Sequence, residues 1–192
     1  MDSTQALSIS PYPGRGVAAC HTERDGLGVI YWLSGRSSAS RRRALVPDDR
    51  GLRVVDLDGL DDDPLRHYRA SLRDSLFEVV GNGDHVDQLA LDLALGISVD
   101  AVYDALEPEP DMIGTPRVAA VVEATTGRVS IGGARPAPSG SGVERQLLGP
   151  TSIRVGMGLL IATYCGDPKS PSPWAEPLWI NAANTLDDQI VP

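Results

Sequence analysis

The chain has 192 residues, 42% of them hydrophobic, which is long enough for one domain with a substantial core. Its formal net charge of −9 argues against nucleic acid as a partner, because a phosphate backbone requires a basic surface. No apolar run approaches the length that crosses a membrane, and the first ten residues lack the basic and apolar regions of a signal peptide. We therefore expect a cytoplasmic protein whose partners include neither nucleic acid nor a membrane.

Residues 1–11 are expected to form a flexible lead-in, and residues 12–192 a single domain. The two cysteines, Cys20 and Cys165, lie in apolar segments and suit a reduced compartment without disulfides. Neither has neighbours that form a metal-ligand pattern, so we interpret both as core residues and predict no metal site.

The first elements are two strands. A turn at residues 12–16 contains Gly-Arg-Gly and enters a short strand at residues 17–20. A polar connection at residues 22–26 leads to a second strand at residues 27–33, so the two strands are predicted to pair as a hairpin.

The segment at residues 34–43 is the most basic part of this acidic chain. It holds four arginines and four serines, a composition that can bind a phosphate through charge-assisted hydrogen bonds. The alternative is an ordinary solvated basic loop. The position favours a binding role, because Arg15 and Arg36 flank the predicted hairpin at the same end.

Further strands are predicted at residues 52–57 and 76–80, while residues 65–72 fit either a strand or a short helical turn. After residue 80 the sequence Gly-Asn-Gly-Asp-His turns into an amphipathic helix at residues 86–95, with Asp84 as the N-cap. His85 sits at this turn, where backbone N–H groups can face a ligand. The alternative is a well-capped connection with a surface histidine.

The rest of the chain is predicted as one more helix and several strands. Gly96 ends the first helix and Ser98 caps a second at residues 99–107, which two prolines terminate. Strands at residues 118–122 and 128–131 flank a Thr-Gly turn, and a buried strand follows at residues 159–162. Residues 132–142 and 166–177 are interpreted as loops because Gly, Pro and Ser dominate them.

Five short motifs, in this order and spacing, resemble the archaeal-type IMP cyclohydrolase family. They are Tyr-Pro-Gly-Arg-Gly from residue 12, Ser-Gly-Arg-Ser-Ser-Ala-Ser-Arg from residue 34, Asn-Gly-Asp-His-Val-Asp from residue 82, Thr-Pro-Arg-Val-Ala-Ala from residue 115, and Ala-Thr-Tyr from residue 162. The resemblance spans residues 12–164. It implies an α+β fold, a four-layer αββα sandwich of two mainly antiparallel sheets like that of N-terminal-nucleophile hydrolases. The helices at residues 86–95 and 99–107 would then pack on an outer face.

The resemblance also implies a reaction, closure of a formamido-imidazole-carboxamide ribonucleotide to IMP with loss of water. This chemistry requires positioning, donors for the developing oxyanion and proton transfer, and it requires no cofactor. The implied partner is a small purine-type ribonucleotide, and assembly into a homo-oligomer is left open.

The site residues implied by the resemblance fall into two groups. Substrate-binding residues are Arg15, Arg36, Ser37, Arg41 and Asn82. Catalytic residues are Arg117, His85, Tyr164 and Tyr68. Arg117 or backbone N–H groups would stabilise the oxyanion, and a tyrosine or histidine would move the proton, in a pocket between the two sheets.

Three departures from the family pattern leave alternatives open. Family members commonly have Asn where this chain has Ser40, and Glu and Asn where it has Met112 and Gly114. A diverged enzyme that closes or opens a ring on a different purine-like nucleotide or nucleoside is one alternative. A non-catalytic nucleotide-binding protein is the other.

Overall fold

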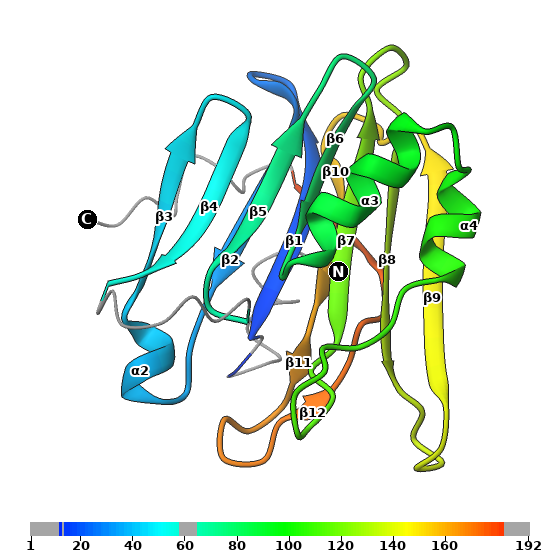
Figure 1. Ribbon diagram of the computed structural model, residues 1–192. Coiled ribbons are helices and arrows are strands. Elements are labelled where there is room, and N and C mark those ends of the chain that lie inside the picture. Colours follow the sequence, from blue (N-terminus) through cyan, green and yellow to red (C-terminus); the bar gives the residue numbers. More distant parts are fainter. Residues whose placement is uncertain (1–11, 13, 58–64, 183–192) are drawn as a thin grey trace.

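The computed structural model describes residue 12 and residues 14–57 and 65–182 (Figure 1). The lead-in expected at residues 1–11 therefore lies outside the described residues. Among the described helices none is long and apolar enough to cross a membrane.

Two antiparallel sheets form most of the described structure. The four-stranded sheet has the order β13-β10-β1-β2, with β1 (Arg15–Thr22), β2 (Gly26–Leu33), β10 (Met157–Ala162) and β13 (Leu178–Asn181). The seven-stranded sheet runs in chain order, with β3 (Arg43–Asp48), β4 (Gly51–Asp56), β5 (Tyr68–Arg73), β6 (Phe77–Gly81), β7 (Arg117–Glu123), β8 (Val129–Pro136) and β9 (Val143–Thr151). A separate two-stranded ribbon pairs β11 (Tyr164–Cys165) with β12 (Ser172–Pro173). The predicted antiparallel topology and the first hairpin are confirmed.

The two large sheets pack face to face through alternate residues of their strands. In β1, Val17 and Ala19 point toward the seven-stranded sheet, where they join a buried cluster that includes Val118 and Ile131. Ala18 and Cys20 point the other way and belong to a different cluster. This period of two is what a strand covered on both faces requires.

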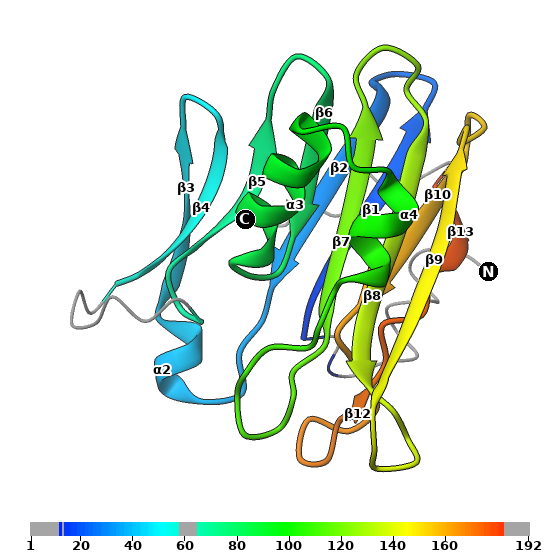
Figure 2. The same ribbon diagram turned by 45° about the vertical axis from the view of Figure 1, so that its right-hand side comes forward.

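Two helices cover the other face of the seven-stranded sheet (Figure 2). They are α3 (His85–Ala94) and α4 (Val99–Asp104), while the four-residue α2 (Ser38–Arg41) lies at one end of the molecule. The predicted helix end is confirmed, because Gly96 has φ +85, a backbone conformation that glycine adopts readily. Ser98 caps α4 through its side chain, whereas Asp84 makes no such bond to α3.

The described residues thus form three of the four expected layers, a helix layer and two sheets. No helix among them covers the outer face of the four-stranded sheet (Figure 1). The stack of two antiparallel sheets is confirmed, and the four-layer αββα arrangement stays a prediction.

Several sequence-based predictions need correction. Residues 132–142 are not a loop throughout, because β8 continues to Pro136 and β9 begins at Val143. Gly132 and Gly133 occur inside β8 because a Cβ there would lie 2.3 Å and 2.5 Å from carbonyl oxygens of the neighbouring strands. Of the two alternatives left open for residues 65–72, a strand or a short helical turn, the structure has the strand, β5. The strands β3, β9, β11, β12 and β13 were not predicted, and β12 lies within residues 166–177, which were expected to be a loop. Cys165 is only half-buried.

The fold brings strand ends together at one end of the molecule. Arg15 begins β1 and pairs with Leu33, the last residue of β2, so Arg36 follows at the same end, as predicted. Gly16 pairs with Ala162 of β10, which places Tyr164 there as well. The turn before α3 reaches this region through Asn82, whose carbonyl accepts a bond from Arg15.

Candidate active site

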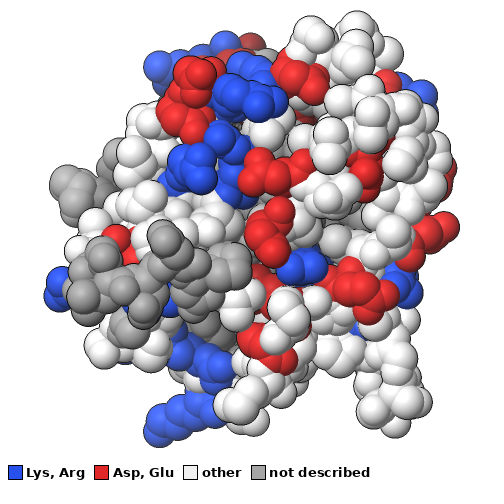
Figure 3. Space-filling model, in the orientation of Figure 1, with Lys and Arg blue, Asp and Glu red and all other residues white. Residues whose placement is uncertain are grey.

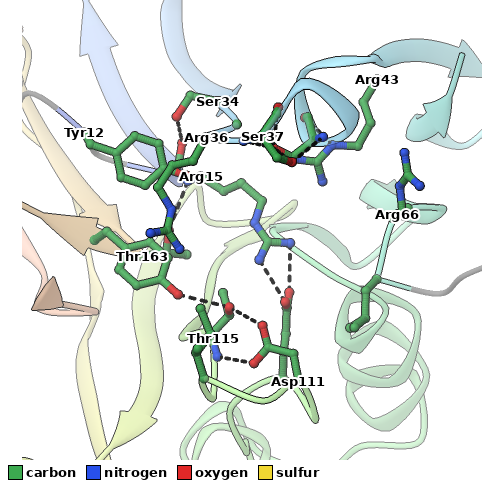
Figure 4. Close-up of a pocket in the computed structure, with 17 residues that line it drawn as sticks. Tyr12, Arg15, Ser34, Arg36, Ser37, Arg43, Arg66, Asp111, Thr115 and Thr163 are labelled. Carbon is green, nitrogen blue, oxygen red and sulfur yellow. Dashed lines mark hydrogen bonds and ion pairs between the residues drawn. The ribbon is translucent and has the colours of Figure 1, made fainter. Parts of the chain in front are cut away.

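A pocket of about 460 Å³ lies at this end of the molecule. Four segments that are distant in the sequence surround it. They are residues 12, 14 and 15, residues 34–43, the loop between α4 and β7, and the pair Thr163 and Tyr164. Figure 4 shows their side chains converging from different elements, with Arg66 on a further side. The pocket is therefore a product of the whole fold rather than of one motif.

Arg15 and Glu109 form a buried ion pair in the wall of the pocket. Their exposed fractions are 8% and 5%. Nη2 of Arg15 donates to Oε2 of Glu109 at 2.9 Å, and its Nη1 lies 2.8 Å from Oε1. Nη1 also donates to the carbonyl oxygen of Asn82 at 2.7 Å, and the guanidinium carbon lies 5.9 Å from the ring centre of Tyr68. Four contacts with three residues thus fix this guanidinium in place.

Burial and charge act in opposite directions on this pair. Burial disfavours the charged guanidinium of Arg15, but the adjacent carboxylate outweighs it and raises the pKa of Arg15. Burial also raises the pKa of the Glu109 carboxyl, an effect that the charge of Arg15 opposes without cancelling. Glu109 is therefore an acid whose proton affinity exceeds that of an exposed glutamate, as general acid–base chemistry requires.

A chain of hydrogen bonds leads from Tyr164 to Asp111. The Thr115 hydroxyl and backbone N–H both donate to the Asp111 carboxylate. Because that hydroxyl proton is committed, the Tyr164 hydroxyl, 3.0 Å away, donates to Oγ1 of Thr115. The Tyr164 oxygen is then left with lone pairs to accept a bond from a ligand. Burial is the main cause that raises the pKa of Tyr164.

The basic segment at residues 34–43 forms the opposite wall. Ser37 and Ser40 cap each other through reciprocal hydrogen bonds, which fixes the short α2. The guanidinium carbon of Arg36 lies 5.7 Å and 6.0 Å from the ring centres of Tyr12 and Tyr164. Nε of Arg43 donates to the carbonyl oxygen of Ser40 at 2.9 Å.

A sequence model of one protein family, described as IMP cyclohydrolase-like protein, matches residues 12–187. The match includes all the segments that surround the pocket. The chain belongs to this family.

Membership in the IMP cyclohydrolase-like family confirms the resemblance that the motifs indicated, and it points to an enzyme of the cyclohydrolase type. No curated protein matches the chain. Among the described residues, no group of His, Cys, Asp and Glu is arranged to hold a metal ion.

The predicted site residues are partly brought together. Those that line the pocket are Arg15, Arg36, Ser37 and Tyr164. Tyr68 lies behind Arg15, where its hydroxyl is 2.8 Å from that of Tyr31, and does not line the pocket. Arg41 lines a smaller adjacent hollow instead.

The remaining three predicted residues lie at the junction of β6, α3 and β7, outside the pocket lining. The fully buried side chain of Asn82 bonds to the backbone of Pro116 and Val118. His85 is 5% exposed, so it is not the surface histidine of the alternative interpretation. Arg117 pairs with Asp84.

His85 is held neutral in this position. Burial, followed by the charge of Arg117, lowers the pKa of His85 to about 3. Its Nε2 lies 3.3 Å from the carbonyl oxygen of Val118 and must donate, so Nδ1 carries no proton. Within the described structure, that Nδ1 has no hydrogen-bond partner.

Sequence reasoning missed the residues of the α4–β7 loop. Glu109, Asp111 and Thr115 line the pocket, whereas Met112 is fully exposed. Met112 thus lies outside the pocket lining, to which this loop contributes the carboxylates of Glu109 and Asp111. The only sequence signal was Glu-Pro-Glu-Pro, which we interpreted as the end of a helix.

Proposed function

We propose that the chain is a cyclohydrolase that closes a formamido-imidazole-carboxamide ribonucleotide to IMP and water. Family membership supports the reaction class. The observation that carries the proposal is the buried Arg15–Glu109 pair, which places an acid of raised pKa in the wall of a nucleotide-sized pocket.

The basic wall of the pocket would bind the ribose 5′-phosphate. In the described part of the chain, neither Arg36 nor Arg43 is paired with a carboxylate, unlike Arg15 with Glu109 and Arg66 with Asp56. Two free guanidiniums match the two charges of a phosphate monoester, and the Ser37 hydroxyl lies beside them. Arg43 therefore takes the place in this proposal that sequence reasoning gave to Arg41.

The first chemical step would join the carboxamide nitrogen to the formyl carbon. The nitrogen loses a proton and the formyl oxygen gains one, which gives a cyclic intermediate that carries a hydroxyl. Glu109 is the group we assign to this proton transfer, because its raised pKa suits both removal and return of a proton. Arg15 would hold Glu109 in position and supply positive charge close to the developing oxyanion.

The second step would release water. Glu109 would take the proton of the former formamide nitrogen as the ring double bond forms and pass it to the hydroxyl, which leaves as water. Tyr164 would accept a hydrogen bond from that N–H group and hold it in position, because the tyrosine's own proton points to Thr115 and Asp111. Glu109 is thus a carboxylate before and after each step, and Tyr164 keeps its proton throughout.

The alternative substrate, a different purine-like nucleotide, rests on one departure that lies in the pocket. Ser40, where the family commonly has Asn, belongs to the pocket lining. A shorter hydroxyl side chain there would leave room for a larger group on the ligand.

The deciding experiment measures turnover of the formamido ribonucleotide by ultraviolet absorbance. It compares three purified proteins, the wild type, Glu109→Gln and Met112→Ala. We expect the wild type and Met112→Ala to form IMP and Glu109→Gln to lose roughly 10²- to 10⁴-fold in kcat. Binding of the ribonucleotide without IMP formation by the wild type would favour the alternative substrate. Full activity of Glu109→Gln would refute the assignment of the acid.

A further inference from the structure

A second hollow of about 230 Å³ adjoins the pocket at the basic segment. Its lining consists of Leu33, Ser34, Gly35, Ser40, Arg41 and Arg43. Four of these six residues also line the main pocket, which makes the two hollows neighbours with a common wall.

Gly35 and Ser40, which line both hollows, are in direct contact. A Cβ on Gly35 would lie 2.5 Å from the carbonyl carbon, carbonyl oxygen and Oγ of Ser40. Only glycine permits this approach, so the two small residues keep the linings of the two hollows close together. Arg43 belongs to the lining of both.

The hollow carries positive charge that no acid of the described residues neutralises. Arg41 donates from Nη2 to the carbonyl oxygen of Arg36 at 2.9 Å, and Arg43 donates from Nε to that of Ser40. These bonds orient both guanidiniums and leave other N–H groups of each for a ligand. Figure 3 shows basic side chains at the lower left, the side on which α2 lies in Figure 1. Such a concentration is unusual for a chain of net charge −9.

We propose that the second hollow binds a phosphate-type oxyanion between Arg41 and Arg43, next to the phosphate of a nucleotide in the main pocket. The oxyanion is either the second phosphate of a nucleoside diphosphate or a separate inorganic phosphate. This site goes beyond the ring closure proposed above, which needs only one phosphate.

The first test is calorimetric titration of inorganic pyrophosphate into the full chain. We expect Arg41→Ala to weaken pyrophosphate binding about tenfold, the effect of one charge-assisted contact. Arg50→Ala, an exposed arginine in the turn between β3 and β4, is the matched control and should bind like the wild type. Unfolding temperatures establish that both variants are folded. Equal binding by Arg41→Ala and the wild type would overturn the proposal.

The second test distinguishes the two sources. If the second phosphate belongs to the nucleotide, IDP binds more tightly than IMP, and Arg41→Ala removes the difference. If it is a separate ion, IMP and IDP bind alike, and inorganic phosphate still binds to the IMP-saturated wild type but not to Arg41→Ala. If the titrations show neither of these two patterns, the proposed second site is refuted. These readouts do not depend on turnover, so a protein that forms no IMP could still bind the second oxyanion.

Discussion

The guanidinium of Arg15 and the carboxylate of Glu109 form a direct ion pair although the two residues are 94 positions apart in the chain. Arg15 begins a strand of the smaller sheet, and Glu109 lies in the loop between a helix and the larger sheet. Their contact therefore joins all three described layers at the pocket. Each residue removed alone would leave the other as a buried, uncompensated charge.

Substitutions of Arg15 and Glu109 should have strongly coupled effects on the free energy of unfolding. Arg15→Met and Glu109→Leu are each expected to lower the free energy of unfolding by about 3–5 kcal/mol, because one charge remains buried without its partner. The double variant should lose much less than the sum of the two. Urea unfolding of the four proteins measures this coupling, and additive losses would contradict it.

His85 should make the protein sensitive to mild acid. Its pKa is about 3 in the folded protein and near 6.5 when unfolded, so between these values the unfolded chain binds one more proton. Stability from neutral His85 is complete above about pH 6.5 and falls by about 1.4 kcal/mol per pH unit below it.

The measurement is the free energy of unfolding at pH 5.0, 6.0 and 7.5 for the wild type and His85→Gln. Below about pH 6.5 the free energy of unfolding of His85→Gln should fall less steeply with decreasing pH than that of the wild type, by about 1.4 kcal/mol per pH unit. His21→Gln, measured in parallel, gives the effect of replacing a histidine elsewhere in the chain. Parallel curves for the wild type and His85→Gln would show that His85 is not held neutral.

Gly83 should be intolerant of even one added methyl group. A Cβ there would lie 3.2 Å from both Oε1 of Glu109 and Nδ1 of His85, two side chains that the ion pair and the Val118 bond hold in place. We expect Gly83→Ala to cost about 1–3 kcal/mol and to reduce turnover. Gly28→Ala, where no atom lies within 4 Å of the new Cβ, is the control and should be neutral or slightly stabilising. Wild-type stability of Gly83→Ala would count against this packing.

Arg36 should contribute to nucleotide affinity more than to stability. It is exposed and its guanidinium lies over Tyr12 and Tyr164, so it can pair with a phosphate without breaking a buried contact. Truncation to Ala should weaken IMP binding by about 1.5–3 kcal/mol, the contribution of a charge-assisted hydrogen bond. Titration of IMP into both proteins measures this, and an unchanged dissociation constant would remove Arg36 from the phosphate site.

The fold could be predicted where local signals agree with tertiary structure. Gly96 and Ser98 end one helix and begin the next as their backbone preferences dictate. The β8–β9 hairpin could not be predicted, because Gly132 and Gly133 suggest a loop locally while the neighbouring strands require their missing side chains. The strand β3 is half-exposed and contains Pro47, so it lacks the apolar alternation of a buried strand.

The candidate site could be predicted where a motif carries its own chemistry. The Gly-Arg-Gly turn and the Ser-Arg segment identified Arg15, Arg36 and Ser37, which line the pocket. Glu109 was beyond reach, because its importance lies in burial against a residue of the first strand. His85 and Asn82 were predicted as site residues because they lie at a turn before a helix. In the structure their side chains instead contact backbone carbonyl groups.

The pocket joins parts of the chain that are 148, 94 and 67 residues apart, all through Arg15. These contacts need both sheets and the loop after α4 to be in place, so they should form late, after the sheets have assembled. Recovery of nucleotide binding in a refolding experiment would then lag behind the packing of Trp32 against the smaller sheet. A partly folded chain would expose its arginines without possessing the site that organises them.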